Sequence, residues 1–208
     1  MLLWSTYVLA SRPDINARLR AEAVDLLARK PDAGYTDLEA LNYMRNFYRE
    51  ILRVYCPGEQ QDMMSPTART GLTSMAATTS PRQAVKDIVI QGVLIPKGTS
   101  IMIQPAVLLR NPTILGENSD HFDPDRWDKL EGEAADGIAF SPFLHGPHAC
   151  IGRAMSMLEF KAILVEVVSR FDFELLDHKV GEPVPVLNPS PVLRPKGGMR
   201  VKVKRVTP

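Results

Sequence analysis

Cys150 lies in the stretch FSPFLHGPHACIGRAMSMLEF, where several side chains capable of chemistry stand close together. His145 and His148 precede the cysteine, and Gly146 and Gly152 stand on either side of it. A cysteine in this setting can be a nucleophile, a metal ligand or a buried core residue. A thiolate that binds iron needs a loop in which backbone N–H groups approach the sulfur, and glycines permit that approach. The helical pattern that follows Gly152 would also bring a helix N-terminus, which favours negative charge, toward the sulfur.

Two other chemistries for this cysteine fit the spacing less well. Zinc bound by His145, His148 and Cys150 would leave the site short of ligands, because structural zinc usually has four in paired spacings and no second pair exists. A Cys–His nucleophile pair needs a third group that orients it, and none is evident. A buried cysteine in front of a core helix stays open as the alternative without chemistry.

The loop also has a longer pattern. Phe143, Gly146, Cys150 and Gly152 fit F-x-x-G-x-x-x-C-x-G. A haem on the open side of such a loop would have the cysteine sulfur as its axial ligand. Donation from a thiolate favours cleavage of the O–O bond in bound dioxygen, so the pattern indicates oxygen chemistry.

Two more motifs precede the loop, and each is unremarkable alone. Glu50 and Arg53 stand at i and i+3 in a helical pattern, where a surface ion pair contributes only a few tenths of a kcal/mol. The letters FDPDRW, which include Arg126 and Trp127, describe a turn with one arginine.

Taken in order, the helical E-x-x-R, the P-[DE]-R-[FW] turn and the cysteine loop resemble the C-terminal signature of the cytochrome P450 family. The stretches PRQAVKDIVIQGVLIPKGT, FDFELL and KGGMRVKVKRV resemble strands of the same family. The resemblance implies a mainly α fold with small β-sheets (α+β). Residues 1–208 would form the C-terminal part of a single cytochrome P450 domain.

The resemblance also implies roles for single residues around haem b. Cys150 would be the axial ligand of the haem iron, with Phe143 packed beside its sulfur and with Gly146 and Gly152 shaping the loop. His148 and Arg82 match positions that bind the haem propionates. A buried ion network would be formed by Glu50, Arg53 and Arg126. Isolated buried charges are costly, so these charges would be paired with one another.

The implied activity is a haem-thiolate monooxygenase that inserts one oxygen atom from dioxygen into a small organic substrate. Electrons would come from NADPH only indirectly, through a redox partner such as a cytochrome P450 reductase. Arg153 and Lys161 would help to dock an acidic redox partner, or would be ordinary solvated helix charges. The alternatives are a catalytically incomplete haem-binding fragment and a haem-thiolate isomerase or dehydratase.

Several features depart from the family pattern. The segment Ala/Gly-Gly-x-Asp/Glu-Thr, which handles oxygen on the distal side in the family, would precede Met1, so we expect no distal catalytic residue in this chain. Residues 57–75 look inserted, and we expect them to be unstructured. Leu144 replaces a glycine and Trp127 a phenylalanine, and both changes look tolerable.

The elements that must position these residues follow from periodicity. We expect helices over 1–10, 11–30, 36–55, 104–111 and 151–171, with Ser11 capping the second and Thr36 or Asp37 opening the third. Two short strands flank Gly92, and further strands lie at 171–176 and 199–206. Residues 111–149 read as mostly irregular.

Composition narrows the class of protein further. The 208 residues carry a net charge of +1, which gives no support to nucleic-acid binding. The two cysteines, Cys56 and Cys150, make no disulfide framework, so a reducing compartment fits best. The apolar start is too short for a membrane span and has no signal-peptide features. Full-length relatives typically sit on the cytosolic face of the endoplasmic reticulum through an anchor that we expect this chain to lack, which leaves its location unknown or cytoplasmic.

Overall fold

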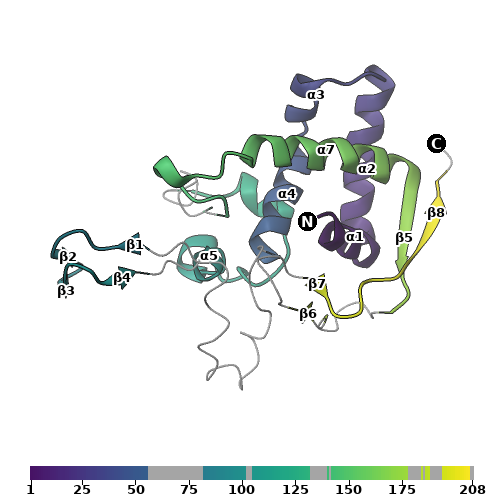
Figure 1. Ribbon diagram of the computed structural model, residues 1–208. Coiled ribbons are helices and arrows are strands. Elements are labelled where there is room, and N and C mark those ends of the chain that lie inside the picture. The colour runs from purple at the N-terminus through teal and green to yellow at the C-terminus, as the bar shows by residue number, and fades with distance from the viewer. Residues whose placement is uncertain are drawn as a thin grey trace.

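The computed structural model describes residues 1–55, 82–101, 105–131, 140, 142–177, 184, 186–187 and 194–206 (Figure 1). The expected insertion at 57–75 lies outside these residues. In the described part, helices form one body and short strand pairs lie at its edges (Figure 1). The predicted class, mainly α with small antiparallel sheets, is confirmed.

The helical body is built from α1 (Leu2–Ser11), α2 (Pro13–Arg29), α4 (Asn42–Val54) and α7 (Arg153–Arg170). Helix α7 packs against α2 and α4, and α1 packs against α2 and strand β5. Buried apolar residues of all four helices meet in one core. The fully or almost fully buried members of this core include Leu19, Ala23, Met44, Phe47, Ile51, Leu164 and Val168.

The start of α2 differs from the prediction. Ser11 is the last residue of α1 and does not cap α2, whose N-cap is Arg12. Arg12 has φ −130° and ψ 81°. A residue before proline is disfavoured in the helical region, so Pro13 moves the break to Arg12. The Arg12 side chain then binds Asp14 in the first turn of α2.

The predicted helix over 36–55 is divided in two. Helix α3 (Tyr35–Glu39) opens after Gly34, so neither Thr36 nor Asp37 begins it. The Asp37 carboxylate instead accepts the Gly34 N–H at 3.1 Å. The apolar stripe continues across the break, because Leu38 and Leu41 are both buried. The apolar period of the sequence therefore runs through the interruption and gives no sign of it.

A carboxylate from another helix caps the start of α4. Glu22 in α2 accepts the backbone N–H groups of Tyr43 at 3.0 Å and Met44 at 2.8 Å. The N-cap residue, Leu41, has no side-chain hydrogen bond to offer. Glu22 therefore satisfies donors that a helix N-terminus otherwise leaves without partners.

The described strands form two-stranded antiparallel sheets. Strand β1 (Arg82–Gln83) pairs with β4 (Ser100–Ile101), and β2 (Ile88–Ile90) pairs with β3 (Val93–Ile95). The β2–β3 turn uses Gln91 and Gly92, both at positive φ, as the predicted strand pair around Gly92 requires. Figure 1 shows this hairpin reaching away from the helical body.

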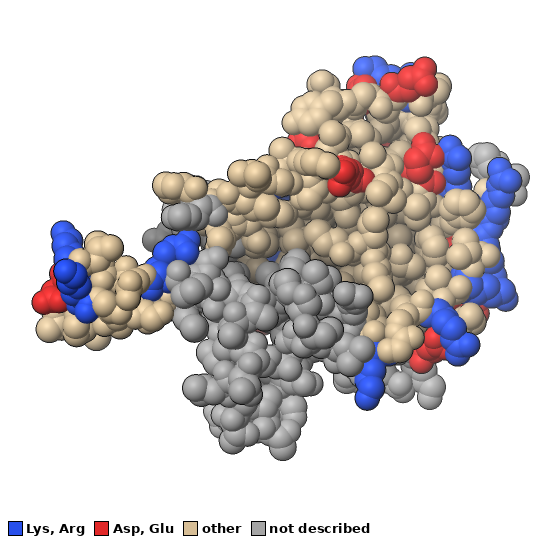
Figure 2. All heavy atoms as spheres, viewed as in Figure 1, with Lys and Arg blue, Asp and Glu red and all other residues tan. Residues whose placement is uncertain are grey.

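Two more strand pairs come from the C-terminal part of the chain. Strands β5 (Phe171–Leu175) and β8 (Val201–Arg205) form where the sequence predicts strands, and they pair with each other. Strand β6 (Val186–Leu187) pairs with β7 (Arg194–Pro195). In Figure 2 charged side chains gather on the β2–β3 hairpin and near the β5–β8 pair. Across the latter pair, Lys204 Nζ lies 3.1 Å from Glu174 Oε2.

Four short helices complete the described structure: α5 (Pro105–Leu108), α6 (Pro112–Leu115), η4 (Pro124–Asp128) and η6 (Gly146–His148). Helix α5 lies within the helix expected over 104–111, whereas α6, η4 and η6 fall in residues 111–149, which the sequence indicates are mostly irregular. Within the described ranges, no helix combines the length and apolarity needed to cross a membrane.

Candidate functional site

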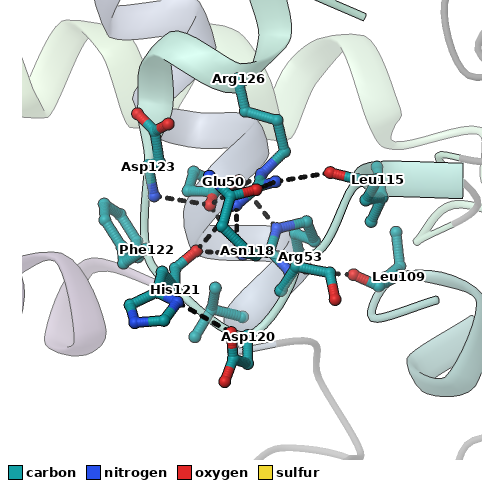
Figure 3. Close-up of polar contacts among 12 residues, drawn as sticks. Glu50, Arg53, Leu109, Leu115, Asn118, Asp120, His121, Phe122, Asp123 and Arg126 are labelled. Carbon is teal, nitrogen blue, oxygen red and sulfur yellow. Dashed lines mark hydrogen bonds and ion pairs between the residues drawn. The ribbon is translucent and has the colours of Figure 1, made fainter. Parts of the chain in front are cut away.

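Glu50 and Arg53 form a buried ion pair within α4 (Figure 3). Arg53 Nε lies 2.9 Å from Glu50 Oε2, and Arg53 Nη2 lies 2.7 Å from Glu50 Oε1. Both side chains are 0% exposed. The helix brings i and i+3 to one face, and the paired geometry satisfies both ends of the carboxylate.

The rest of the Arg53 guanidinium binds the chain between α5 and η4. It donates to the carbonyl oxygens of Leu109 at 3.0 Å and His121 at 2.7 Å, and also to that of Ser119. A guanidinium has several donors in a fixed plane, so one buried arginine can bind three backbone carbonyl groups. Arg53 therefore fixes the irregular segment against α4.

Arg126 in η4 approaches the same carboxylate. Its Nε lies 3.7 Å from Glu50 Oε1, and its side chain is 4% exposed. Its Nη1 donates to the Leu115 carbonyl at 2.7 Å, and its Nη2 donates to the Asn118 carbonyl at 2.7 Å (Figure 3). Burial lowers the pKa of Arg126, and Glu50 opposes that shift. The three residues predicted to form a network thus lie together and are buried.

Two more groups from the η4 turn donate to Glu50. The backbone N–H of Asp123 lies 2.8 Å from Glu50 Oε1, and Trp127 Nε1 lies 3.1 Å from Oε2. The Trp127 ring also packs edge-on against Phe140, just before the cysteine loop, at 4.9 Å between ring centres. Glu50 is therefore the common acceptor that joins α4 to η4.

The cysteine loop is closed by backbone hydrogen bonds at Cys150. The Cys150 N–H donates to the Phe143 carbonyl at 2.9 Å, and the Arg153 N–H donates to the Cys150 carbonyl at 3.3 Å. Gly146 has φ +71°, and Leu144 has φ +59°. Glycine accepts this left-handed conformation freely, whereas leucine is strained in it.

The thiol of Cys150 is exposed at the start of α7. A Cβ built on Gly152, the N-cap of α7, would lie 3.8 Å from Cys150 Sγ, so this glycine lies beside the sulfur. The first turn of α7 contains no acidic residue. The positive end of the helix dipole is therefore not offset there, which suits a negatively charged ligand atom.

Two large hydrophobic residues that follow Cys150 in the sequence are exposed. Ile151 is 104% exposed and Met155 is 65% exposed, although both are large hydrophobic residues. Apolar residues exposed next to an exposed thiol fit a flat apolar group that binds metal through sulfur. The donor set and its surroundings therefore fit haem.

Tyr48 lies behind the loop and was not singled out from the sequence. Its ring stacks on Phe143 at 6.4 Å between centres and meets Phe160 edge-on at 4.9 Å. Its position relative to Met44 and Ile51 in the helical period indicates a buried residue. The helical spacing of apolar residues does not indicate what the Tyr48 hydroxyl binds.

The other candidate residues are placed as follows. Arg82 is exposed in β1, at the end of the hairpin nearest the helical body (Figure 1). His148 lies in η6, and its side chain is outside the described part of the structure, whereas His145 is exposed. Among the described side chains, which leave out His148, no group of three metal-binding residues forms a site.

Lys161 corrects one expectation. It is 0% exposed, and its Nζ donates to the Leu38 carbonyl at 3.0 Å and lies 3.4 Å from Glu39 Oε1. Burial lowers its pKa. Lys161 fixes α7 to the end of α3, and it is neither a docking residue nor a solvated charge.

A sequence model of the cytochrome P450 family matches residues 72–203, which include Arg82, Arg126 and Cys150. The chain belongs to the cytochrome P450 family. Glu50 and Arg53 precede the matched range. Longer alignments with individual cytochromes P450 extend across them.

Relatives in three kingdoms support the assignment. The chain is 31% identical over 183 residues to cytochrome P450 monooxygenase sphH of Aspergillus fumigatus, covering 84% of this chain and 30% of that protein. It is 28% identical over 204 residues to a cytokinin hydroxylase of Arabidopsis thaliana, covering 98% of this chain and 35% of the relative. It is 28% identical over 173 residues to the protein named CYP13A3 of Caenorhabditis elegans, covering 83% of this chain and 30% of that protein. The chain thus spans about a third of the length of these cytochromes P450.

Proposed function

We propose that this chain forms the thiolate-bearing side of a haem monooxygenase, with Cys150 as the axial ligand of the iron. The observation that carries the proposal is the exposed Cys150 thiol beside exposed Ile151, at the N-terminal end of α7. When bound, haem supplies the activation of dioxygen, from which one oxygen atom passes to an organic substrate. The substrate would be a small organic molecule.

The residues of this chain hold and orient the ligand. The two backbone hydrogen bonds of Cys150 fix its main chain, and Gly152 leaves the sulfur open on one side. Ile151 and Met155 are exposed apolar residues close to Cys150 in the sequence, and they would cover part of a bound haem. Glu50, Arg53 and Arg126 hold the segment before the loop in place, so they act on geometry rather than on the substrate.

Two basic residues are proposed to bind the propionates of haem b. His148 and Arg82 carry groups that pair with carboxylates, and Arg82 is exposed in β1. The support for these roles is the match to the family motif together with this exposure. Substituting either residue should weaken haem binding without changing the iron ligand.

We further propose that an acidic redox partner, such as a reductase that draws on NADPH, docks beside α7. Arg153 is exposed there. The pKa of Arg49 is lowered by burial and also by Arg45 and Arg153, which indicates neighbouring positive charges. Like charges held close together attract an acidic surface and speed its approach.

One experiment tests the haem-thiolate proposal. The protein is loaded with haem, reduced and exposed to carbon monoxide, and the absorption of the Soret band is recorded. We expect the strongly red-shifted band of a thiolate ligand, which should be lost in Cys150→Ser and kept in Cys56→Ser. A spectrum that is the same in the parent and in Cys150→Ser would overturn the proposal.

Turnover separates the monooxygenase from a protein that only binds haem. With NADPH, a reductase and candidate organic substrates, a monooxygenase forms an oxygenated product whose added atom comes from labelled dioxygen. A thiolate spectrum without any product across the candidates would favour the incomplete haem-binding alternative.

A further inference from the structure

Tyr48 is a buried residue of α4 whose ring contacts the cysteine loop and whose hydroxyl contacts α7. Tyr48 is 1% exposed. The ring lies nearly parallel to that of Phe143, with 10° between the planes, and packs edge-on against Phe160 in α7. Aromatic contacts of this kind stabilise beyond simple burial, so the ring fixes Phe143 against α4.

The hydroxyl of Tyr48 reaches the first turn of α7. Its oxygen lies 3.1 Å from Ser156 Oγ, and Ser156 Oγ donates to the Arg153 carbonyl at 3.1 Å. A serine hydroxyl has one hydrogen, so once Ser156 donates to Arg153 it can only accept from Tyr48. Burial raises the pKa of Tyr48, in keeping with a phenol that retains its proton and donates. The hydrogen bonds therefore run from Tyr48 through Ser156 to Arg153.

The two residues that Tyr48 holds are the backbone partners of Cys150. The Cys150 N–H donates to the Phe143 carbonyl, and the Cys150 carbonyl accepts from the Arg153 N–H. The ring of Tyr48 fixes the first partner, and its hydroxyl fixes the second through Ser156. One side chain thus braces both hydrogen bonds of the cysteine backbone.

We propose that Tyr48 is a positioning residue that sets where the Cys150 sulfur lies relative to a bound iron. The inference rests on the proposed function, because it assumes that the sulfur binds haem iron. A ligand must be held within a fraction of an ångström of its productive position, and residues behind it supply that precision. The loop itself cannot, since its sulfur and neighbouring Ile151 are exposed and touch little.

The test uses Tyr48→Phe, which keeps the ring and removes the hydroxyl. The haem-loaded protein is reduced with carbon monoxide bound, and the share of molecules with a thiol-type Soret band is compared with the share of thiolate type. We expect that the thiol-type share rises several-fold in Tyr48→Phe and in Ser156→Ala. The double variant should go no further than the single ones, because both remove the same bond. Ser156→Thr, which keeps a hydroxyl, should restore the parent ratio.

Tyr43→Phe is the matched control, because it is the same substitution in the same helix beside Arg18 and away from the loop. Its spectrum should match that of the parent. Thermal unfolding of each variant checks that the fold is kept, and if Tyr48→Phe does not fold, Ser156→Ala decides. Parent-like spectra in Tyr48→Phe or Ser156→Ala, with a thiolate band in the parent, would overturn the positioning role alone. A parent without any thiolate band would instead overturn the proposed function.

Discussion

Trp127 donates its indole N–H to Glu50 across 3.1 Å, so an aromatic side chain of η4 contributes directly to the buried ion pair of α4. The position most often holds phenylalanine in the family that the sequence resembles, and phenylalanine cannot make this bond. The tryptophan is therefore more than a tolerated replacement. It gives the Glu50 carboxylate one more donor.

Replacing Trp127 with phenylalanine tests the worth of that donor. The aromatic contact with Phe140 can persist while the hydrogen bond to a buried carboxylate is lost, so the free energy of unfolding should fall by about 2 kcal/mol. Chemical denaturation measures it. Asp125→Asn in the same turn breaks only an exposed pair with Arg18 and should cost less than about 1 kcal/mol. Equal losses in both variants would contradict the prediction.

Removing the carboxylate should have a larger effect. Glu50→Ala leaves Arg53 without its buried counter-charge and Arg126 without its nearest one, so we expect a loss of about 3–5 kcal/mol in stability. We also expect purified protein to lose haem, measured as haem per polypeptide. Asp25→Ala breaks an exposed pair with Arg29 and serves as the control. Normal haem content in Glu50→Ala would contradict the positioning role of the network.

Leu144 offers a test of backbone strain. Its φ of +59° is costly for leucine and alanine but free for glycine. Leu144→Ala and Leu144→Gly both remove the side chain, and only glycine relieves the strain. We therefore expect the glycine variant to be the more stable of the two by about 1 kcal/mol, the reverse of the usual order in an ordered segment. If alanine proves more stable in chemical denaturation, the loop does not hold this conformation in solution.

The raised pKa of Tyr43 predicts how the free energy of unfolding changes at high pH. Burial raises its pKa to about 12 from an ordinary value of 10.0. The folded state therefore favours the neutral phenol, and this contribution is complete below about pH 10 and is lost as pH rises through about 12. In denaturation series over that range, the parent should lose stability relative to Tyr43→Phe. Parallel curves for the two proteins would show that Tyr43 titrates alike in both states.

The proposed docking surface predicts a dependence on salt. Arg153→Ala should weaken binding of an acidic reductase several-fold at low ionic strength, and the difference should shrink as salt screens the charges. Binding is measured by titration against the haem-loaded protein. Lys204→Ala, on the β5–β8 pair, is the control. An unchanged affinity in Arg153→Ala would place the docking surface elsewhere.

The sequence predicts the helical core from local spacing, whereas the buried ion network with Arg126 is expected only from the resemblance to the cytochrome P450 family. The i and i+3 positions of Glu50 and Arg53 put them on one face, and the apolar period locates Met44 and Phe47. Local spacing also explains the errors. The proline that follows Arg12 moved a helix boundary that Ser11 had been expected to mark.

Contacts between distant parts of the chain could not be predicted from the sequence pattern. Lys161 looks like a helix surface charge until α3 brings the Leu38 carbonyl to it. Tyr48 reads as one more core residue until α7 brings Ser156 to its hydroxyl. In both cases the partner lies more than a hundred positions away, and no periodic pattern reports it.

The Glu22 carboxylate at the start of α4 has a consequence for how the site is assembled. Starting a helix is the costly step in its formation, and Glu22 stabilises that first turn from a neighbouring helix. Glu50, Arg53 and Tyr48 all follow in the same helix. The positions of these three residues therefore depend on how α2 packs at the start of α4, although α2 contributes none of the candidate site residues. Variation at Glu22 would therefore act on Glu50, Arg53 and Tyr48 through the start of α4, without a contact to any of them.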